Sequence, residues 1–95
     1  RRFTAGEALA MGLVNRVVPV DQLEGLVKEY TDMIKENAPL TIRAAKATVN
    51  EVLKDPDDRD LVALQEMIKS CFDSADFTEG RTAFMEKRKP NFTGK

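Results

Sequence analysis

The chain has 95 residues, of which 42% are apolar, and its 15 lysines and arginines against 16 aspartates and glutamates give a net charge of −1, as in an ordinary globular protein of at most one domain. It contains no histidine, which excludes Ser-His-Asp and Cys-His nucleophile systems and histidine-ligated zinc. Its single cysteine, Cys71, cannot form an internal disulfide, so we expect a reducing compartment, the cytoplasm or alternatively the mitochondrial matrix.

The N-terminal residues predict a short helix followed by one short strand. Thr4 and Glu7 have the spacing of a capping box that begins the helix, and Gly12 stands where a left-handed residue would close it. Residues 13–18 are rich in β-branched side chains and precede Pro19, which predicts a strand. No later segment has a strand pattern, so this strand needs a partner from missing sequence or from another copy of the chain.

Four further helices are predicted, over about residues 21–37, 39–54, 57–72 and 76–89. The first and last begin at D-x-x-E boxes that open with Asp21 and Asp76, and Pro39 suits the first turn of the second. Gly80 lies inside the last helix, where it costs roughly 1 kcal/mol relative to alanine, so we expect another backbone to approach it. The expected fold class is all-α, with about five helices and one short strand near the N-terminus, and residues 1–95 form one region.

The carboxylates argue against an acid–base pair because capping and the helix dipole explain their positions. Seven of them stand at predicted helix starts: Glu7, Asp21, Glu24, Asp57, Asp58, Asp76 and Glu79. Cys71 lies on an apolar stripe with no histidine to form its thiolate, so we interpret it as a small buried hydrophobe. Gly-rich phosphate loops are absent. We therefore assign no catalytic residue and no metal ligand to this chain.

The C-terminal residues concentrate positive charge. Residues 81–95 contain Arg81, Lys87, Arg88, Lys89 and Lys95 against Glu86 alone, a net charge of +4. Two interpretations remain open: basic residues at a helix C-terminus are stabilised by the dipole without any ligand, or they form an anion site. Phe84 lies one helical turn before Arg88, so a ring could accompany a phosphate held by the cations.

Several phrases together resemble a known family. They are Arg-Phe-Thr-Ala-Gly-Glu-Ala at residues 2–8, Met-Gly-Leu-Val-Asn-Arg-Val-Val-Pro at 11–19, Asn-Ala-Pro-Leu at 37–40, Cys-Phe-Asp-Ser-Ala-Asp-Phe-Thr-Glu-Gly at 71–80 and Ala-Phe-Met-Glu-Lys-Arg-Lys-Pro-Asn-Phe at 83–92. In order and spacing they resemble the C-terminal helical region of the enoyl-CoA hydratase/isomerase (crotonase) family. The resemblance covers nearly the whole chain, and Glu-Lys-Arg-Lys-Pro is its most specific part.

The resemblance implies that residues 1–95 are the last third of a lyase that adds water across the C2–C3 double bond of enoyl-CoA thioesters. The oxyanion hole and catalytic carboxylates of such enzymes lie in an N-terminal part, so this chain alone should be inactive. A chain that does not begin with methionine agrees with that expectation. The family also implies an acyl-CoA substrate, no separate cofactor, and homo-oligomers, namely trimers that often pair into hexamers.

The resemblance also implies a coenzyme A (CoA) contact. Lys87 matches the family lysine that reaches from one subunit toward CoA phosphates bound by its neighbour, and Phe84 would line that pocket. Lys89 and Arg88 are weaker candidates.

Other readings of the sequence remain. The parent could be an enoyl-CoA isomerase or another acyl-CoA enzyme of the same superfamily, or this stretch could be a purely structural oligomerisation module. A small nucleic-acid-binding module is disfavoured because the chain has a pI of about 5.5 and only 6% aromatic residues. No apolar run approaches the roughly 18 to 20 residues that cross a bilayer, so we expect neither nucleic acid nor membrane as a partner.

Overall fold

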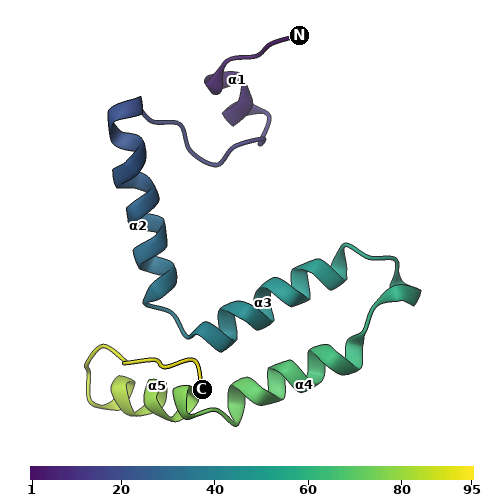
Figure 1. Cartoon of the computed structure of the whole chain (residues 1–95), viewed down its shortest axis with the longest axis vertical. Coiled ribbons are helices and arrows are strands. Elements are labelled where there is room, and N and C mark those ends of the chain that lie inside the picture. Colours follow the sequence, from purple (N-terminus) through teal and green to yellow (C-terminus); the bar gives the residue numbers. More distant parts are fainter. The chain divides into compact units, whose positions relative to one another are not determined.

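The computed structural model describes residues 1–95 and contains helices but no strand (Figure 1). The α-helices are α1 (Ala5–Ala10), α2 (Leu23–Lys35), α3 (Pro39–Val52), α4 (Leu61–Phe72) and α5 (Ala75–Met85), with 3-10 turns η1 (Val20–Gln22) and η2 (Pro56–Asp58). The chain forms two compact units, residues 1–31 and 32–95. The all-α class and the number of α-helices are confirmed.

Helix α1 begins and ends as its sequence predicts. The Thr4 hydroxyl accepts the Glu7 N–H at 3.2 Å, and the Glu7 carboxylate accepts the Thr4 N–H at 2.8 Å. At the other end Gly12 is left-handed, with φ +75°, and the Leu13 N–H donates to the Ala8 carbonyl at 2.9 Å. This Schellman ending needs positive φ, which glycine adopts without steric cost.

The strand predicted over residues 13–18 is absent, so that prediction was wrong. These residues form an irregular connection that leads through η1 into α2. A strand is stabilised by ladder hydrogen bonds to a neighbour, and no other segment of the chain lies extended beside it in a ladder. The β-branched side chains alone therefore do not produce a strand. Helix α2 begins at Leu23, two residues later than its predicted start at Asp21.

Helix α2 ends where the sequence predicts and keeps an uncovered apolar face. The Asn37 side-chain amide donates to the Met33 carbonyl at 2.6 Å, which satisfies one of the last carbonyls of the helix. Apolar residues recur along α2 at helical spacing, but Val27 is 52% exposed and Ile34 is 54% exposed. An amphipathic helix normally packs such a face against a core. Within residues 1–31, Val27 therefore has no such core around it.

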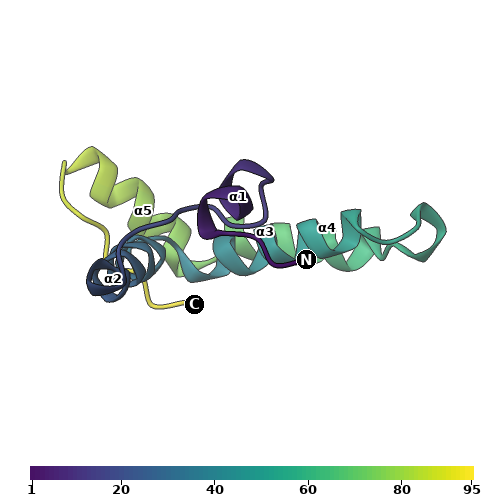
Figure 2. The ribbon, with the colours of Figure 1, turned by 90° about the horizontal axis from the view of Figure 1, so that it is seen from above.

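Helices α3 and α4 form a hairpin within residues 32–95, joined by η2 and lying side by side in both views (Figures 1 and 2). Pro39 occupies the first turn of α3, as predicted. Ala44 is buried on α3, and a small side chain there allows the neighbouring backbone to come near. The hairpin positions two of the three helices that line the site described below.

Polar groups on either side of η2 satisfy the ends of both helices. Arg59 donates from Nε to the Glu51 carbonyl at 3.1 Å and from its terminal nitrogen to the Val52 carbonyl at 2.9 Å. In return the Glu51 carboxylate accepts the Asp60 N–H at 2.9 Å, just before α4 begins. The Lys54 ammonium and the Asp60 N–H both lower the pKa of Glu51. The corner is therefore held by charge-assisted hydrogen bonds rather than by apolar contacts.

The helices bury very little apolar surface against one another. The buried apolar residues are Ala8, Ala44 and Ala83, and no large side chain is fully buried. Leu53, by contrast, is 80% exposed. Globular chains of this composition usually bury their large aliphatic side chains.

None of the helices is long and apolar enough to span a bilayer.

We expect Arg59→Ala to lower the free energy of unfolding by about 1 to 3 kcal/mol, because two α3 carbonyls lose a charged donor. Urea denaturation followed by far-UV circular dichroism measures this. Arg43→Ala, on the exposed surface of α3, is the matched control and should change stability by less than about 0.5 kcal/mol. Equal effects of the two variants would contradict the role given to Arg59.

Candidate functional site

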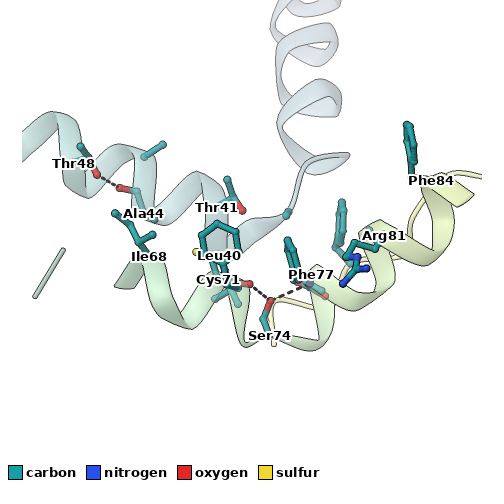
Figure 3. Close-up of a pocket in the computed structure, with 16 residues that line it drawn as sticks. Leu40, Thr41, Ala44, Thr48, Ile68, Cys71, Ser74, Phe77, Arg81 and Phe84 are labelled. Carbon is teal, nitrogen blue, oxygen red and sulfur yellow. Dashed lines mark hydrogen bonds between the residues drawn. The ribbon is translucent and has the colours of Figure 1, made fainter. Parts of the chain in front are cut away.

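An apolar groove of about 640 Å³ runs between α3, α4 and α5 in the C-terminal unit (Figure 3). Helix α3 contributes Leu40, Thr41, Ala44 and Thr48, α4 contributes Ile68, Cys71 and Phe72, α5 contributes Phe77, Gly80, Arg81 and Phe84, and Phe92 follows from the C-terminal segment. Small side chains on the α3 side leave the space open. The size and apolar lining are typical of a binding groove for a small molecule or a side-chain cluster.

Aromatic side chains and one arginine form the α5 side of the groove. Phe72 and Phe77 meet edge to face with ring centroids 5.3 Å apart, and the Arg81 guanidinium stands 5.9 Å from the Phe77 centroid. Figure 3 shows Phe84 beyond Arg81, at the end of the helix. Cys71 is half-buried among these residues, which fits the apolar role predicted for it.

Helix α5 ends at Met85, four residues before its predicted end at Lys89. The Lys87 N–H donates to the Phe84 carbonyl at 3.2 Å, and the Arg88 N–H donates to the Ala83 carbonyl at 3.0 Å. These two bonds form a Schellman ending in which Lys87 takes the left-handed position, with φ +54°. A residue with a β-carbon is strained there. Because glycine usually occupies this position, the sequence carries no signal for the early end of α5.

The basic residues Lys87, Arg88 and Lys89, which follow directly after α5, differ in their partners. Arg88 pairs with Glu79 at 2.6 Å and with Glu86 at 2.7 Å, and these carboxylates raise its pKa. Lys89 is 87% exposed and lies 3.5 Å from Glu36. The Lys87 ammonium makes no hydrogen bond or ion pair. Among these three residues Lys87 alone has no carboxylate partner, whereas Arg88 is paired with two carboxylates.

Asp76 does not begin α5, contrary to the sequence-based prediction. Ser74 is the N-cap, and its hydroxyl accepts the Phe77 N–H at 3.1 Å. The Asp76 side chain is 3% exposed and accepts the N–H groups of Thr93 and Gly94, each at 2.7 Å. The local D-x-x-E pattern was misleading because the carboxylate has partners 17 and 18 residues away.

Residues 88–95, which we call the return segment, run back along α5 toward its start (Figure 2). The Asp76 N–H donates to the Lys95 carbonyl at 3.0 Å, which adds a bond in the opposite direction. The Phe92 ring lies 3.5 Å from where a β-carbon on Gly80 would stand. The neighbour of Gly80 within this chain is thus a ring and not the backbone expected from the sequence.

The return segment lowers the pKa of Asp76 and supplies the ion-pair partner of Glu79. The Thr93 N–H lowers the pKa of Asp76 against the opposing effect of burial, and the Gly94 N–H lowers it further. Glu79 forms an ion pair with Arg88. Both carboxylates have partners within the chain, and no group of three or more Cys, Asp or Glu side chains is arranged to hold a metal ion. The arrangement places basic side chains close to an aromatic-lined groove, which suits binding of an anionic ligand.

Comparison with known proteins matches residues 1–95 to the family model described as "Enoyl-CoA hydratase/isomerase". The chain is 40% identical to methylmalonyl-CoA decarboxylase of Escherichia coli K12, over 97% of the chain and 36% of that protein. It is also 40% identical to crotonyl-CoA hydratase of Syntrophomonas wolfei, over 98% of the chain and 36% of that protein. The chain therefore spans little more than a third of either relative.

The fold is similar to a solved structure described as an enoyl-CoA hydratase from Bacillus anthracis. The TM-score is 0.77 at 36% sequence identity, and the match covers all of this chain and 37% of that one. The helical arrangement described above therefore recurs inside a longer chain.

We expect the attachment of the return segment to depend on pH only in acid. The pKa of Asp76 is lowered in the folded chain, so its contribution is complete above the unfolded pKa of about 3.9 and is lost as the pH falls through the lower folded pKa. Hydrogen exchange at the Thr93 and Gly94 amides should show protection that is constant from neutral pH to about pH 5 and then falls. In Asp76→Asn the protection should be low at every pH. Protection that is lost between about pH 5 and 7 would contradict this assignment.

Proposed function

The chain belongs to the enoyl-CoA hydratase/isomerase family, and we propose that it is the C-terminal helical part of a longer lyase that adds water across the C2–C3 double bond of enoyl-CoA thioesters. Its match to relatives described as crotonyl-CoA hydratase and short-chain-enoyl-CoA hydratase, at 40% and 38% identity, supports this proposal. The groove and its surroundings offer no acid–base pair. In the proposal the catalytic groups belong to another part of the polypeptide, and residues 1–95 alone are inactive.

A second candidate is another acyl-CoA enzyme of the same family, such as an isomerase or a decarboxylase. The 40% identity to methylmalonyl-CoA decarboxylase favours it as strongly as the hydratase matches favour the first. The names of these relatives describe different reactions, but each name includes a CoA thioester. Within the proposal, the task of this region is therefore the one common to both candidates, which is holding CoA and assembling subunits.

Lys87 is the residue to which we assign contact with the CoA phosphates. Its ammonium has no partner within the chain. Its backbone has a left-handed conformation, which glycine would adopt with less steric strain. Strained positions that persist are often functional. A charge-assisted hydrogen bond from Lys87 to a phosphate would contribute about 1.5 to 3 kcal/mol.

Phe84 and Lys89 have secondary roles in this proposal. Phe84 lines the groove and is 82% exposed, so its ring is open to a ligand or to a neighbouring subunit. Lys89 is exposed and lies near Glu36; such surface pairs contribute little, so its ammonium can turn to an anion at small cost. Arg88 is paired with two carboxylates. In this proposal it stabilises the chain after α5 and does not contact the ligand.

Subunit assembly is the other proposed task, as a trimer or a hexamer of the complete enzyme. Large apolar side chains stay exposed along several helices: Val27, Tyr30, Ile34, Val52, Leu53, Leu61, Val62, Phe72 and Met85. Monomeric proteins rarely expose extended apolar patches. We infer that the rest of the enzyme and its neighbouring subunits cover these faces.

Lys87→Gly should separate binding from stability. We expect CoA affinity of the complete enzyme to fall about ten- to a hundredfold as the charge is lost. Unfolding free energy should rise by about 0.5 to 1 kcal/mol, because relief of the left-handed strain exceeds the entropy glycine gains in the unfolded chain. Isothermal titration with CoA and urea denaturation measure the two effects.

The matched variants are Lys87→Ala, which removes the charge but keeps the strain, and Lys87→Arg, which keeps both. Lys87→Ala should bind CoA as weakly as Lys87→Gly without being stabilised, and Lys87→Arg should bind within a few-fold of the natural enzyme. Unchanged CoA affinity in Lys87→Gly would refute the proposed contact.

We expect residues 1–95 produced alone to self-associate at micromolar concentration through the exposed apolar faces. Sedimentation velocity would show species larger than the 10.6 kDa chain. Because the contacts are apolar, association should persist in about 0.5 M salt, which screens exposed charges. A folded monomer, or association abolished by salt, would argue against apolar assembly.

A further inference from the structure

The return segment is bound to α5 at successive points that begin next to Lys87. Arg88 pairs with Glu79 at 2.6 Å, the Phe92 ring covers Gly80, and the Asp76 carboxylate holds the Thr93 and Gly94 N–H groups at 2.7 Å. The backbone on both sides of Lys87 is therefore fixed, by the helix end before it and by the return segment after it.

Asp76 makes the most buried of these attachments. Its side chain is 3% exposed, and its oxygens accept two backbone N–H groups and the Thr93 hydroxyl, at 3.3 Å. Bonds to an ionised acceptor are stronger than those between neutral groups. The Arg88 pair, by contrast, is partly exposed, with 42% of the arginine side chain open, so solvent weakens it.

We propose that Asp76 is a positioning residue for Lys87: by holding the return segment against α5, it keeps the lysine backbone left-handed and its ammonium in place for the CoA phosphates. This inference rests on the proposed function. A left-handed conformation is unfavourable for lysine in a free chain, so it persists only where the surroundings impose it. Release of the return segment removes the constraint after Lys87, and the binding-competent arrangement becomes only fractionally populated.

The expected loss of CoA affinity follows from the fraction of molecules in the binding-competent arrangement. Apparent affinity falls in proportion to the fraction of molecules in the competent state. For a left-handed lysine that is no longer constrained, this fraction is on the order of one tenth. We therefore expect about a tenfold weakening of CoA binding. The loss cannot exceed the loss caused by removing the lysine itself.

The test uses the complete enzyme with the variants Asp76→Asn and Thr93→Pro. The first weakens the acceptor. The second removes a donor N–H without altering α5, since proline has none, and serves if the first fails to fold. Asp73→Asn is the matched control, because that carboxylate lies on the surface and pairs only with Lys69. The probes are CoA and pantetheine, which lacks the phosphates, measured by isothermal titration, together with KM and kcat for an enoyl-CoA.

We expect Asp76→Asn and Thr93→Pro to weaken CoA binding about tenfold, to leave pantetheine binding unchanged, and to raise KM without lowering kcat. Asp73→Asn should behave like the natural enzyme. In a Lys87→Gly background, Asp76→Asn should cause no further loss of CoA affinity, because the residue through which it acts is gone.

Natural CoA affinity in both Asp76→Asn and Thr93→Pro, an equal loss for pantetheine, or a loss that adds fully to that of Lys87→Gly would overturn the positioning role. In those cases Lys87→Gly still weakens CoA binding and the proposed function stands. If Lys87→Gly itself binds CoA normally, the proposed function fails and this inference fails with it.

Discussion

The buried carboxylate of Asp76 is the interaction on which the C-terminal half of the molecule depends. It lies in the first turn of α5 and binds backbone groups near the end of the chain, so the segment after the helix returns along it. Between these anchors the chain makes a tight left-handed turn at Lys87. The Asp76 carboxylate thereby holds the end of the return segment at the start of α5, and the Phe92 ring packs against Gly80 between these points.

Local signals predicted most of the helices, because a few neighbouring residues determine where such helices begin and end. The Thr4–Glu7 capping box, the Gly12 ending and Pro39 at the start of α3 all involve groups within five residues of one another. Chemistry of this kind can be read directly from the sequence.

Predictions failed where a distant or missing partner decides the structure. Residues 13–18 have strand composition but no neighbouring strand. The predicted start of α5 was wrong because the Asp76 carboxylate accepts hydrogen bonds from Thr93 and Gly94 instead of capping the helix. The predicted end of α5 was wrong because a lysine occupies the left-handed position that glycine usually takes. In the candidate site, the basic cluster and Phe84 could be selected from sequence. The different partners of Arg88 and Lys87 could not be predicted. The charge of Arg88 is balanced by Glu79, which lies nine residues earlier in the sequence and is reached only because the chain turns back along α5.

Exposed apolar surface and an unpartnered cation have the same explanation in this account. The helices bury only alanines among the apolar residues, and the chain spans 36% of the length of the decarboxylase and the crotonyl-CoA hydratase that it resembles. Both observations agree with our proposal that other portions of an acyl-CoA enzyme complete the uncovered helix faces and the surroundings of Lys87. Phe84, which lines the groove between α3, α4 and α5, stands three residues before Lys87 at the end of α5.

The most direct test is a structure of the complete enzyme with CoA bound. The account predicts a phosphate oxygen of CoA within about 3 Å of the Lys87 Nζ atom, as in charge-assisted hydrogen bonds, with the return segment still bound to Asp76. A CoA molecule whose phosphates are held by other residues, with the Lys87 side chain in open solvent, would contradict it.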